Sequence, residues 1–151
     1  MQASRMPNLC LIPTGNFMLD MATLGGFVDG AGAMVYGLES CGKTTVLLKA
    51  VAEFMKKHPT KHVLWVDAES MLDREWARKL GVDLSRLQHH RPVTGEEAVD
   101  VIDAAQKTLD IGLVVLDSIP SLVPMQTAEI SAEDAMVAPI PRLCGRMITN
   151  T

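Results

Sequence analysis

The sequence has few cysteines: Cys10, Cys41 and Cys144 are the three found among 151 residues. Their spacing matches no thiol metal motif, and an odd number scattered along the chain argues against a framework of disulfides. The sequence therefore excludes a disulfide-rich secreted scaffold and a thiolate metal site. It predicts a protein of the reducing cytoplasm.

Positive charge is also in short supply, since 14 basic residues face 18 acidic ones and the formal net charge is −4. No global positive field attracts a nucleic acid or an anionic membrane, so any such partner must be held locally. Long hydrophobic runs are missing too. None is long enough to span a bilayer, and the apolar patch at residues 9–12 is too short for a signal-peptide core. We expect no membrane partner.

The remaining composition is that of an ordinary globular domain, with 48% hydrophobic and 21% charged residues. Short apolar runs predict strands at residues 33–36, 62–67 and 113–116, the last of them buried on both sides. Amphipathic periodicity and capping signals predict helices at residues 43–58, 73–80 and 94–109. Alternating strands and helices predict an α/β fold with a parallel sheet.

The most specific local motif is the segment GLESCGKTT at residues 37–45, which fits G-x-x-x-x-G-K-[ST] between a predicted strand and a predicted helix. In such a loop the glycines let backbone N–H groups point at phosphates, Lys43 reaches their outer oxygens, and Thr44 offers a hydroxyl to Mg²⁺. The alternative is a glycine-rich turn with an accidental lysine. The candidate nucleotide contacts are Gly37, Glu39, Ser40, Cys41, Gly42, Lys43, Thr44 and Thr45.

Two other predicted strands end in carboxylates, Asp67-Ala68-Glu69 and Asp117-Ser118. Ligands of an open parallel sheet bind beyond the carboxyl ends of its strands. There Asp117 can hold the hydration shell of Mg²⁺ beside Thr44, or else simply cap the strand. Glu69 is the candidate that orients and deprotonates an attacking water, and a solvated loop glutamate is its alternative.

Several segments together resemble the bacterial and phage RecA recombinases, at residues 37–45, 66–69, 72–83, 94–98 and 115–118. Their order and spacing match as well, and the likeness runs from about Thr14 to Ser118 with a weaker tail. The resemblance implies an α/β P-loop NTPase of the RecA-like type, with a parallel sheet flanked by helices and incomplete at the C-terminus. It also implies ATP and Mg²⁺ as cofactors.

The resemblance also implies roles for individual residues of this sequence. The glutamate matching Glu69 activates the water, the aspartate matching Asp117 supports Mg²⁺, and the loop with Lys43 holds the triphosphate. The adenine contacts would fall on Asp73 and Trp76.

Two residues depart from the family pattern. Trp76 stands where the family often has tyrosine, which preserves a flat stacking face; a core tryptophan is the alternative. Cys41 replaces a common serine and is either a reactive thiol in the loop or a small residue that fills space.

Family members bind single-stranded DNA through two mobile loops and form filaments with ATP between neighbours. The first loop corresponds to about residues 126–141, which contain no lysine or arginine before Arg142. Arg146 matches a position that touches the DNA backbone, and a solvated helix arginine is its alternative. The second loop and the N-terminal polymerisation helix have no counterpart in the sequence.

We therefore expect a lead-in at residues 1–30, an ATP-binding core at residues 31–118, and a mobile DNA-loop-like segment with the start of a truncated helix at residues 119–151. The leading hypothesis is the truncated ATP-binding portion of a single-stranded-DNA-dependent ATPase of homologous recombination and DNA repair. An incomplete sheet predicts self-association or a complementing recombinase subunit. The alternative is a nucleotide-binding interaction module that joins or modulates filaments without DNA activity of its own.

Overall fold

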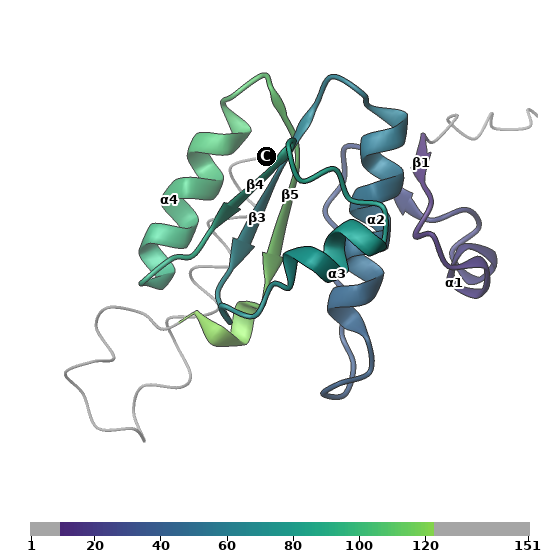
Figure 1. Ribbon diagram of the computed structural model, residues 1–151, viewed down its shortest axis with the longest axis horizontal. Helices are drawn as coiled ribbons and strands as arrows, with labels where there is room; N and C mark the ends of the chain where they lie inside the picture. The colour runs from purple at the N-terminus through teal and green to yellow at the C-terminus, as the bar shows by residue number, and fades with distance from the viewer. Residues whose placement is uncertain (1–9, 123–151) are drawn as a thin grey trace, which may run out of the picture.

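The computed structural model describes residues 10–122 of the chain. Figure 1 shows one small antiparallel pair of strands beside a larger α/β unit. The elements, in chain order, are β1 Leu11–Ile12, α1 Phe17–Ala22, β2 Phe27–Val28, α2 Lys43–Lys57, β3 His62–Asp67, α3 Arg74–Lys79, β4 Leu87–His90, α4 Gly95–Gln106, β5 Ile111–Asp117 and a 3₁₀ turn at Ile119–Ser121. No helix in residues 10–122 is long and apolar enough to cross a membrane.

The main sheet is parallel and has the order β4-β3-β5, so that β3 lies at its centre. Val66 of β3 pairs with His90 of β4, and Asp67 pairs with Asp117 of β5. The carboxyl ends of the strands therefore meet at one edge. This arrangement confirms the predicted α/β class and parallel sheet.

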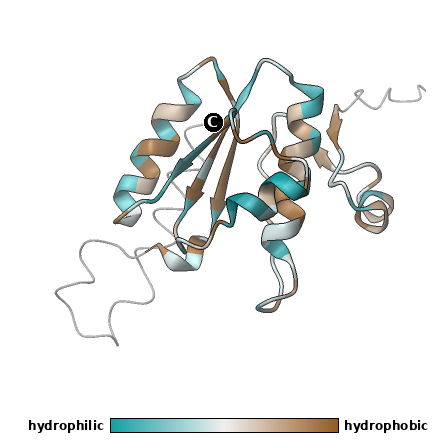
Figure 2. Ribbon diagram, in the orientation of Figure 1, coloured by the Kyte–Doolittle hydropathy of each residue, from teal (hydrophilic) through white to brown (hydrophobic). Residues whose placement is uncertain are grey.

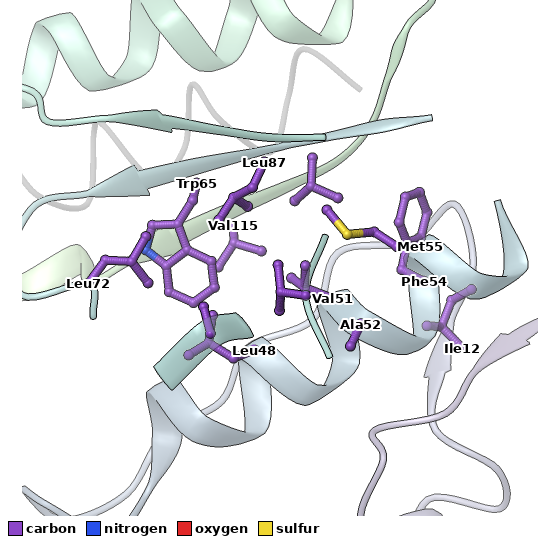
Figure 3. Close-up of a cluster of buried hydrophobic side chains, with 13 residues drawn as sticks. Ile12, Leu48, Val51, Ala52, Phe54, Met55, Trp65, Leu72, Leu87 and Val115 are labelled. Carbon is purple, nitrogen blue, oxygen red and sulfur yellow. The ribbon is translucent and has the colours of Figure 1, made fainter. Parts of the chain in front are cut away.

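Helices cover both faces of the sheet, with α2 and α3 on one side and α4 on the other (Figure 1). Successive residues of a strand point to opposite faces. Trp65 of β3 accordingly packs with Leu48 and Val51 of α2 in the core shown in Figure 3. Its neighbour Val66 packs on the other face, in a cluster that includes Ile102 of α4. Figure 2 shows that β3 and β5 are largely hydrophobic, whereas the shorter β4 is hydrophilic.

Helix α2 begins at Lys43, as the motif predicts, and ends at Lys57 two residues before Pro59. The predicted apolar stripe is buried at Ala50, Val51, Phe54 and Met55. Helix α4 begins after Thr94, whose hydroxyl accepts the backbone N–H of Glu97 at 3.1 Å. Both helices were predictable because each combines a cap or loop signal with an amphipathic pattern.

One expectation about strands is wrong, and another holds only in part. Residues 33–36 form no strand, and the side chains of Met34 and Tyr36 are 73% and 88% exposed. A strand needs a neighbour, and within residues 10–122 no strand pairs with this segment. Strand β5 packs against the hydrophobic clusters on both faces of the sheet, but Val115 alone among its residues is fully buried. Within the same residues β5 pairs with β3 alone, which leaves its outer edge open.

Candidate functional site

The start of α2 and the end of β5 meet at a direct hydrogen bond. The hydroxyl of Thr44 donates to Oδ2 of Asp117 at 2.7 Å, although the two residues lie 73 positions apart. A cavity of about 240 Å³ opens beside this contact. Its walls bring together six of the fourteen site residues named from the sequence, Thr44, Thr45, Glu69, Asp73, Trp76 and Asp117. Leu48, Asp67 and Met71 complete the lining.

Asp117 sits in a negatively charged part of this cavity. Burial raises its pKa above the ordinary value, and the hydrogen bond from Thr44 opposes the rise. The carboxylates of Glu69 and Asp67 raise the pKa further, and the charge of Lys43 lowers it. The net effect is a raised pKa. Such a group gains from a cation nearby, because a positive charge would offset both the burial and the repulsion.

The donor set suits Mg²⁺ bound together with a phosphate. No group of three or more His, Cys, Asp or Glu side chains in the described part of the chain is arranged to hold a metal alone. Mg²⁺ needs no such cage, because it is usually bound through one or two carboxylates, phosphate oxygens and waters. The hydroxyl of Thr44 and the carboxylate of Asp117 supply oxygen ligands of this kind.

The glycine-rich loop, residues 37–42, projects from the molecule beside this cavity and does not line it. Gly42 adopts a left-handed conformation, with φ at +92°, as the chain turns into α2. The ammonium of Lys43 donates to the carbonyls of Gly37 and Leu38, at 3.3 and 2.9 Å. The predicted contacts Glu39, Ser40 and Cys41 are exposed on the same loop.

Glu69 lies in the turn that follows β3, and its carboxylate is held from the end of β5. Its Oε1 accepts the hydroxyl of Ser118 at 2.5 Å and that of Ser121 at 3.2 Å. The two serines also contact each other at 3.1 Å. Glu69 is therefore an exposed residue with a fixed carboxylate, which differs from a freely solvated one. Neither serine has a role predicted from the sequence, although Ser118 belongs to the strand end that resembles the family and Ser121 follows it by three residues.

Asp73 and Trp76 come together at the start of α3. Oδ1 of Asp73 accepts the backbone N–H of Trp76 at 3.0 Å, so Asp73 caps the helix. The side chain of Trp76 is 44% exposed and lines the cavity. Trp76 is not a core residue, whereas Trp65 is fully buried. One face of the Trp76 ring is thus available to a flat ligand.

Asp67 is a second buried carboxylate of the site, and only 3% of it is exposed. Burial raises its pKa, but the backbone hydrogen bond from Leu72 and the hydrogen bond from His89 more than offset this, and the pKa is lowered overall. Nε2 of His89 lies 3.0 Å from Oδ2 of Asp67. The sequence reasoning assigned no role to either residue.

The candidate DNA contacts Arg142 and Arg146 lie outside the described residues, as does the predicted first DNA loop at residues 126–141. These assignments stay predictions.

The fold and the cavity define an α/β protein with a candidate ligand site at the carboxyl edge of a parallel sheet. Residues 2–150 match the RecA N-terminal domain, and the chain belongs to this family. The resemblance inferred from the sequence is thereby confirmed at the family level.

Curated relatives named Protein RecA come from diverse bacteria. The chain is 37% identical over 136 residues to that of Mesomycoplasma hyopneumoniae, covering 89% of this chain and 40% of the relative. It is 38% identical over 142 residues to Protein RecA of Petrotoga mobilis, and the match covers 93% of this chain and 38% of the relative. It is 39% identical over 151 residues to Protein RecA of Streptomyces avermitilis, and the match covers 98% of this chain and 40% of the relative. The chain thus spans about two fifths of the length of these relatives.

Proposed function

We propose that this chain is the ATP-binding portion of a RecA-type recombinase, which couples ATP binding and hydrolysis to DNA strand exchange in homologous recombination and repair. The observation that carries the proposal is the contact between Thr44 and Asp117. It brings the end of the glycine-rich loop to the end of β5, in the cavity that Glu69 also lines. Membership of the RecA family favours a recombinase over the nucleotide-binding interaction module.

The glycine-rich loop and α2 would bind the triphosphate as in a P-loop NTPase. The backbone N–H groups of the first turn of α2 receive no side-chain cap from Gly42, so they are free to face an anion. Lys43 would exchange the carbonyls of Gly37 and Leu38 for phosphate oxygens. Thr44 and Asp117 would hold Mg²⁺, which when bound neutralises charge on the phosphates.

Glu69 would act on the attacking water. A carboxylate that accepts bonds from Ser118 and Ser121 through Oε1 keeps Oε2 for a further partner. Because the serines fix its orientation, the side chain pays little entropy to reach a catalytic geometry. Glu69 would orient the water and take its proton as the water attacks the terminal phosphate.

The adenine ring would stack on Trp76, with Thr45 and the carboxylate of Asp73 near its edge. The cavity, at about 240 Å³, is below the range of roughly 300–1,000 Å³ that is usual for ligand pockets. It would therefore enclose only part of the nucleotide, and the glycine-rich loop would cover the phosphates.

The remaining partners follow from the family assignment. Single-stranded DNA would be bound with the help of Arg142 and Arg146. The open edge of β5 favours assembly with a further recombinase segment or subunit, because an unpaired edge invites pairing. The protein would act in the cytoplasm.

Titration with ATP and Mg²⁺ tests the nucleotide site, with Trp76 fluorescence as the signal. Acrylamide quenches the fluorescence of the exposed Trp76 more than that of the buried Trp65, so it distinguishes the two signals. Lys43→Ala should abolish the response. Lys56→Ala, which changes an exposed lysine at the far end of the same helix, should leave it intact. Equal responses from both variants would contradict the proposed phosphate site.

A further inference from the structure

Asp67 and His89 form a buried pair beneath the turn that carries Glu69. The side chain of His89 is 12% exposed and that of Asp67 is 3% exposed. Because a carboxylate with a lowered pKa is ionised and can only accept, Nε2 of His89 donates to Oδ2 at 3.0 Å. His89 lies on β4 opposite Trp65 of β3, so the bond also joins two neighbouring strands. The guanidinium of Arg91 is also near, with its Nε 3.9 Å from the same oxygen.

The same carboxylate organises the turn at residues 68–72. Oδ1 of Asp67 accepts the backbone N–H of Met71 at 3.1 Å, and Oδ2 accepts that of Leu72 at 3.0 Å. Ser70, inside the turn, has φ at +55°, in the left-handed region that side chains rarely adopt. A conformation of this kind persists only where surrounding contacts hold it. The carboxylate of Asp67 therefore constrains the path of the backbone that follows Glu69.

We propose that His89 is a positioning residue for ATP hydrolysis, which fixes the carboxylate of Asp67 and through it the turn that presents Glu69. This inference rests on the proposed ATPase function of the site. The competing explanation is a hydrogen-bonded pair that only stabilises the contact between β3 and β4. The two explanations differ in what they predict for the turn and for turnover.

The contacts around Asp67 predict how the loss of the His89 side chain affects ATP hydrolysis. Without the N–H of His89, Oδ1 keeps the bond from Met71, and Oδ2 keeps the bond from Leu72 and the ion pair with Arg91 at 3.9 Å. The carboxylate loses one of its contacts and is held less firmly. The acceptor of the Met71 and Leu72 amides is then less rigid, and the turn with Glu69 gains freedom relative to the phosphate. The glycine-rich loop stands on α2 and is untouched by this change. The loss therefore falls more on kcat than on KM, although Met71 of the turn lines the cavity.

The strand supplies a matched control. His90, the next residue of β4, makes a similar bond with Nε2 3.0 Å from Oε1 of Glu97 on α4. This pair joins the sheet to α4 and has no contact with the turn at residues 68–72. His90→Leu removes the same type of group from the same strand. His89→Gln retains an N–H donor, and His89→Leu does not.

The experiment makes two kinds of measurement on the full chain and its three variants. The first is hydrogen exchange of the Met71 and Leu72 amides, and the second is the kinetics of ATP hydrolysis, which give kcat and KM. We expect His89→Leu to speed exchange of both amides about tenfold, because the variant removes one hydrogen bond to the charged carboxylate that holds them. We expect it to lower kcat about tenfold to a hundredfold, with KM within about twofold. His89→Gln should recover most of both losses, and His90→Leu should match the wild type.

The outcomes separate the inference from the function on which it rests. Unchanged amide exchange in His89→Leu would overturn the inference, and so would unchanged kcat. Equal effects of His89→Leu and His90→Leu would overturn it too, because general destabilisation explains them. A wild-type chain without any turnover would contradict the proposed ATPase, while amide exchange would still decide whether His89 holds the turn.

Discussion

The hydroxyl of Thr44 lies 2.7 Å from Oδ2 of Asp117 and joins the first turn of α2 to the end of β5. Both groups offer oxygen ligands, and they come from the two segments that the sequence alone marked as phosphate loop and metal-bearing strand end. Their contact means that the packing of α2 on the sheet brings the two proposed Mg²⁺ ligands together. Removal of either group should therefore damage metal-dependent binding more than folding.

Thr44→Val tests this relationship directly. The substitution keeps the shape of the side chain and removes the hydroxyl, so we expect Mg²⁺-dependent ATP affinity to fall about tenfold, as for the loss of one bond to a charged group. Isothermal titration with and without EDTA measures the effect. Binding in EDTA should be nearly equal in the variant and the wild type. An affinity for ATP and Mg²⁺ that matches the wild type would remove Thr44 from the metal site.

Glu69→Gln should retain ATP binding and lose hydrolysis. The amide is nearly isosteric and can still accept from Ser118, but it cannot take a proton from water. We expect turnover to fall at least about a hundredfold, within the usual range for a general base. A phosphate-release assay measures turnover, and a fluorescent ATP analogue measures binding. Undiminished turnover would exclude Glu69 from the mechanism.

Ser121→Ala should have a smaller effect in the same direction. Glu69 keeps its bond from Ser118 in this variant, so its carboxylate is loosened and not lost. We expect turnover between that of the wild type and that of Glu69→Gln, with ATP affinity unchanged. The same two assays give the order of the three proteins. A Ser121→Ala variant as inactive as Glu69→Gln would mean that Ser121 does more than orient the carboxylate.

The two tryptophans should separate stability from binding. Trp65 is fully buried in the core under α2, so Trp65→Ala should lower the free energy of unfolding by about 3–5 kcal/mol. Trp76 is 44% exposed, and Trp76→Ala should change that free energy by only about 0.5 kcal/mol. Urea denaturation measures both values. Trp76→Ala should instead weaken ATP binding, and an unchanged affinity would contradict stacking of adenine on this ring.

Asp83 should make stability depend on pH in the acid range. Hydrogen bonds from Ser85 and from the guanidinium of Arg86 lower the pKa of Asp83 to about 2. The folded-state pKa is below the unfolded value, so this contribution is fully present above the ordinary pKa of 3.8 and is lost as the pH falls toward 2. Urea denaturation between these limits should show a shallower pH dependence for Asp83→Asn than for the wild type. Identical slopes would show that these hydrogen bonds do not hold in solution.

The sequence predicted well those features that depend on local pattern. Helix α2 follows from the loop motif and its apolar stripe, and α4 follows from the cap at Thr94. The convergence of Glu69 and Asp117 on one cavity follows from a single rule, because the parallel strands β3 and β5 end at the same edge. Thr44 reaches the same cavity from the first turn of α2.

Features that depend on distant neighbours could not be predicted in this way. Strand β4 has the sequence Leu-Gln-His-His, which shows no apolar run, and it forms because the edge of β3 accepts a partner. Residues 33–36 are apolar but lack a neighbouring strand in the part of the chain that the structure describes. The bonds of Glu69 to Ser118 and of Asp67 to His89 join residues 49 and 22 positions apart. No local sequence pattern predicts such contacts.

ATP hydrolysis by the purified chain, with and without single-stranded DNA, tests the central claim most directly. Lys43→Ala measures the background from contaminating ATPases, since Lys43 is the residue proposed to hold the phosphates. The account predicts hydrolysis that depends on Lys43 and Mg²⁺ and that rises when single-stranded DNA is added. Hydrolysis equal to that of Lys43→Ala under both conditions would contradict it.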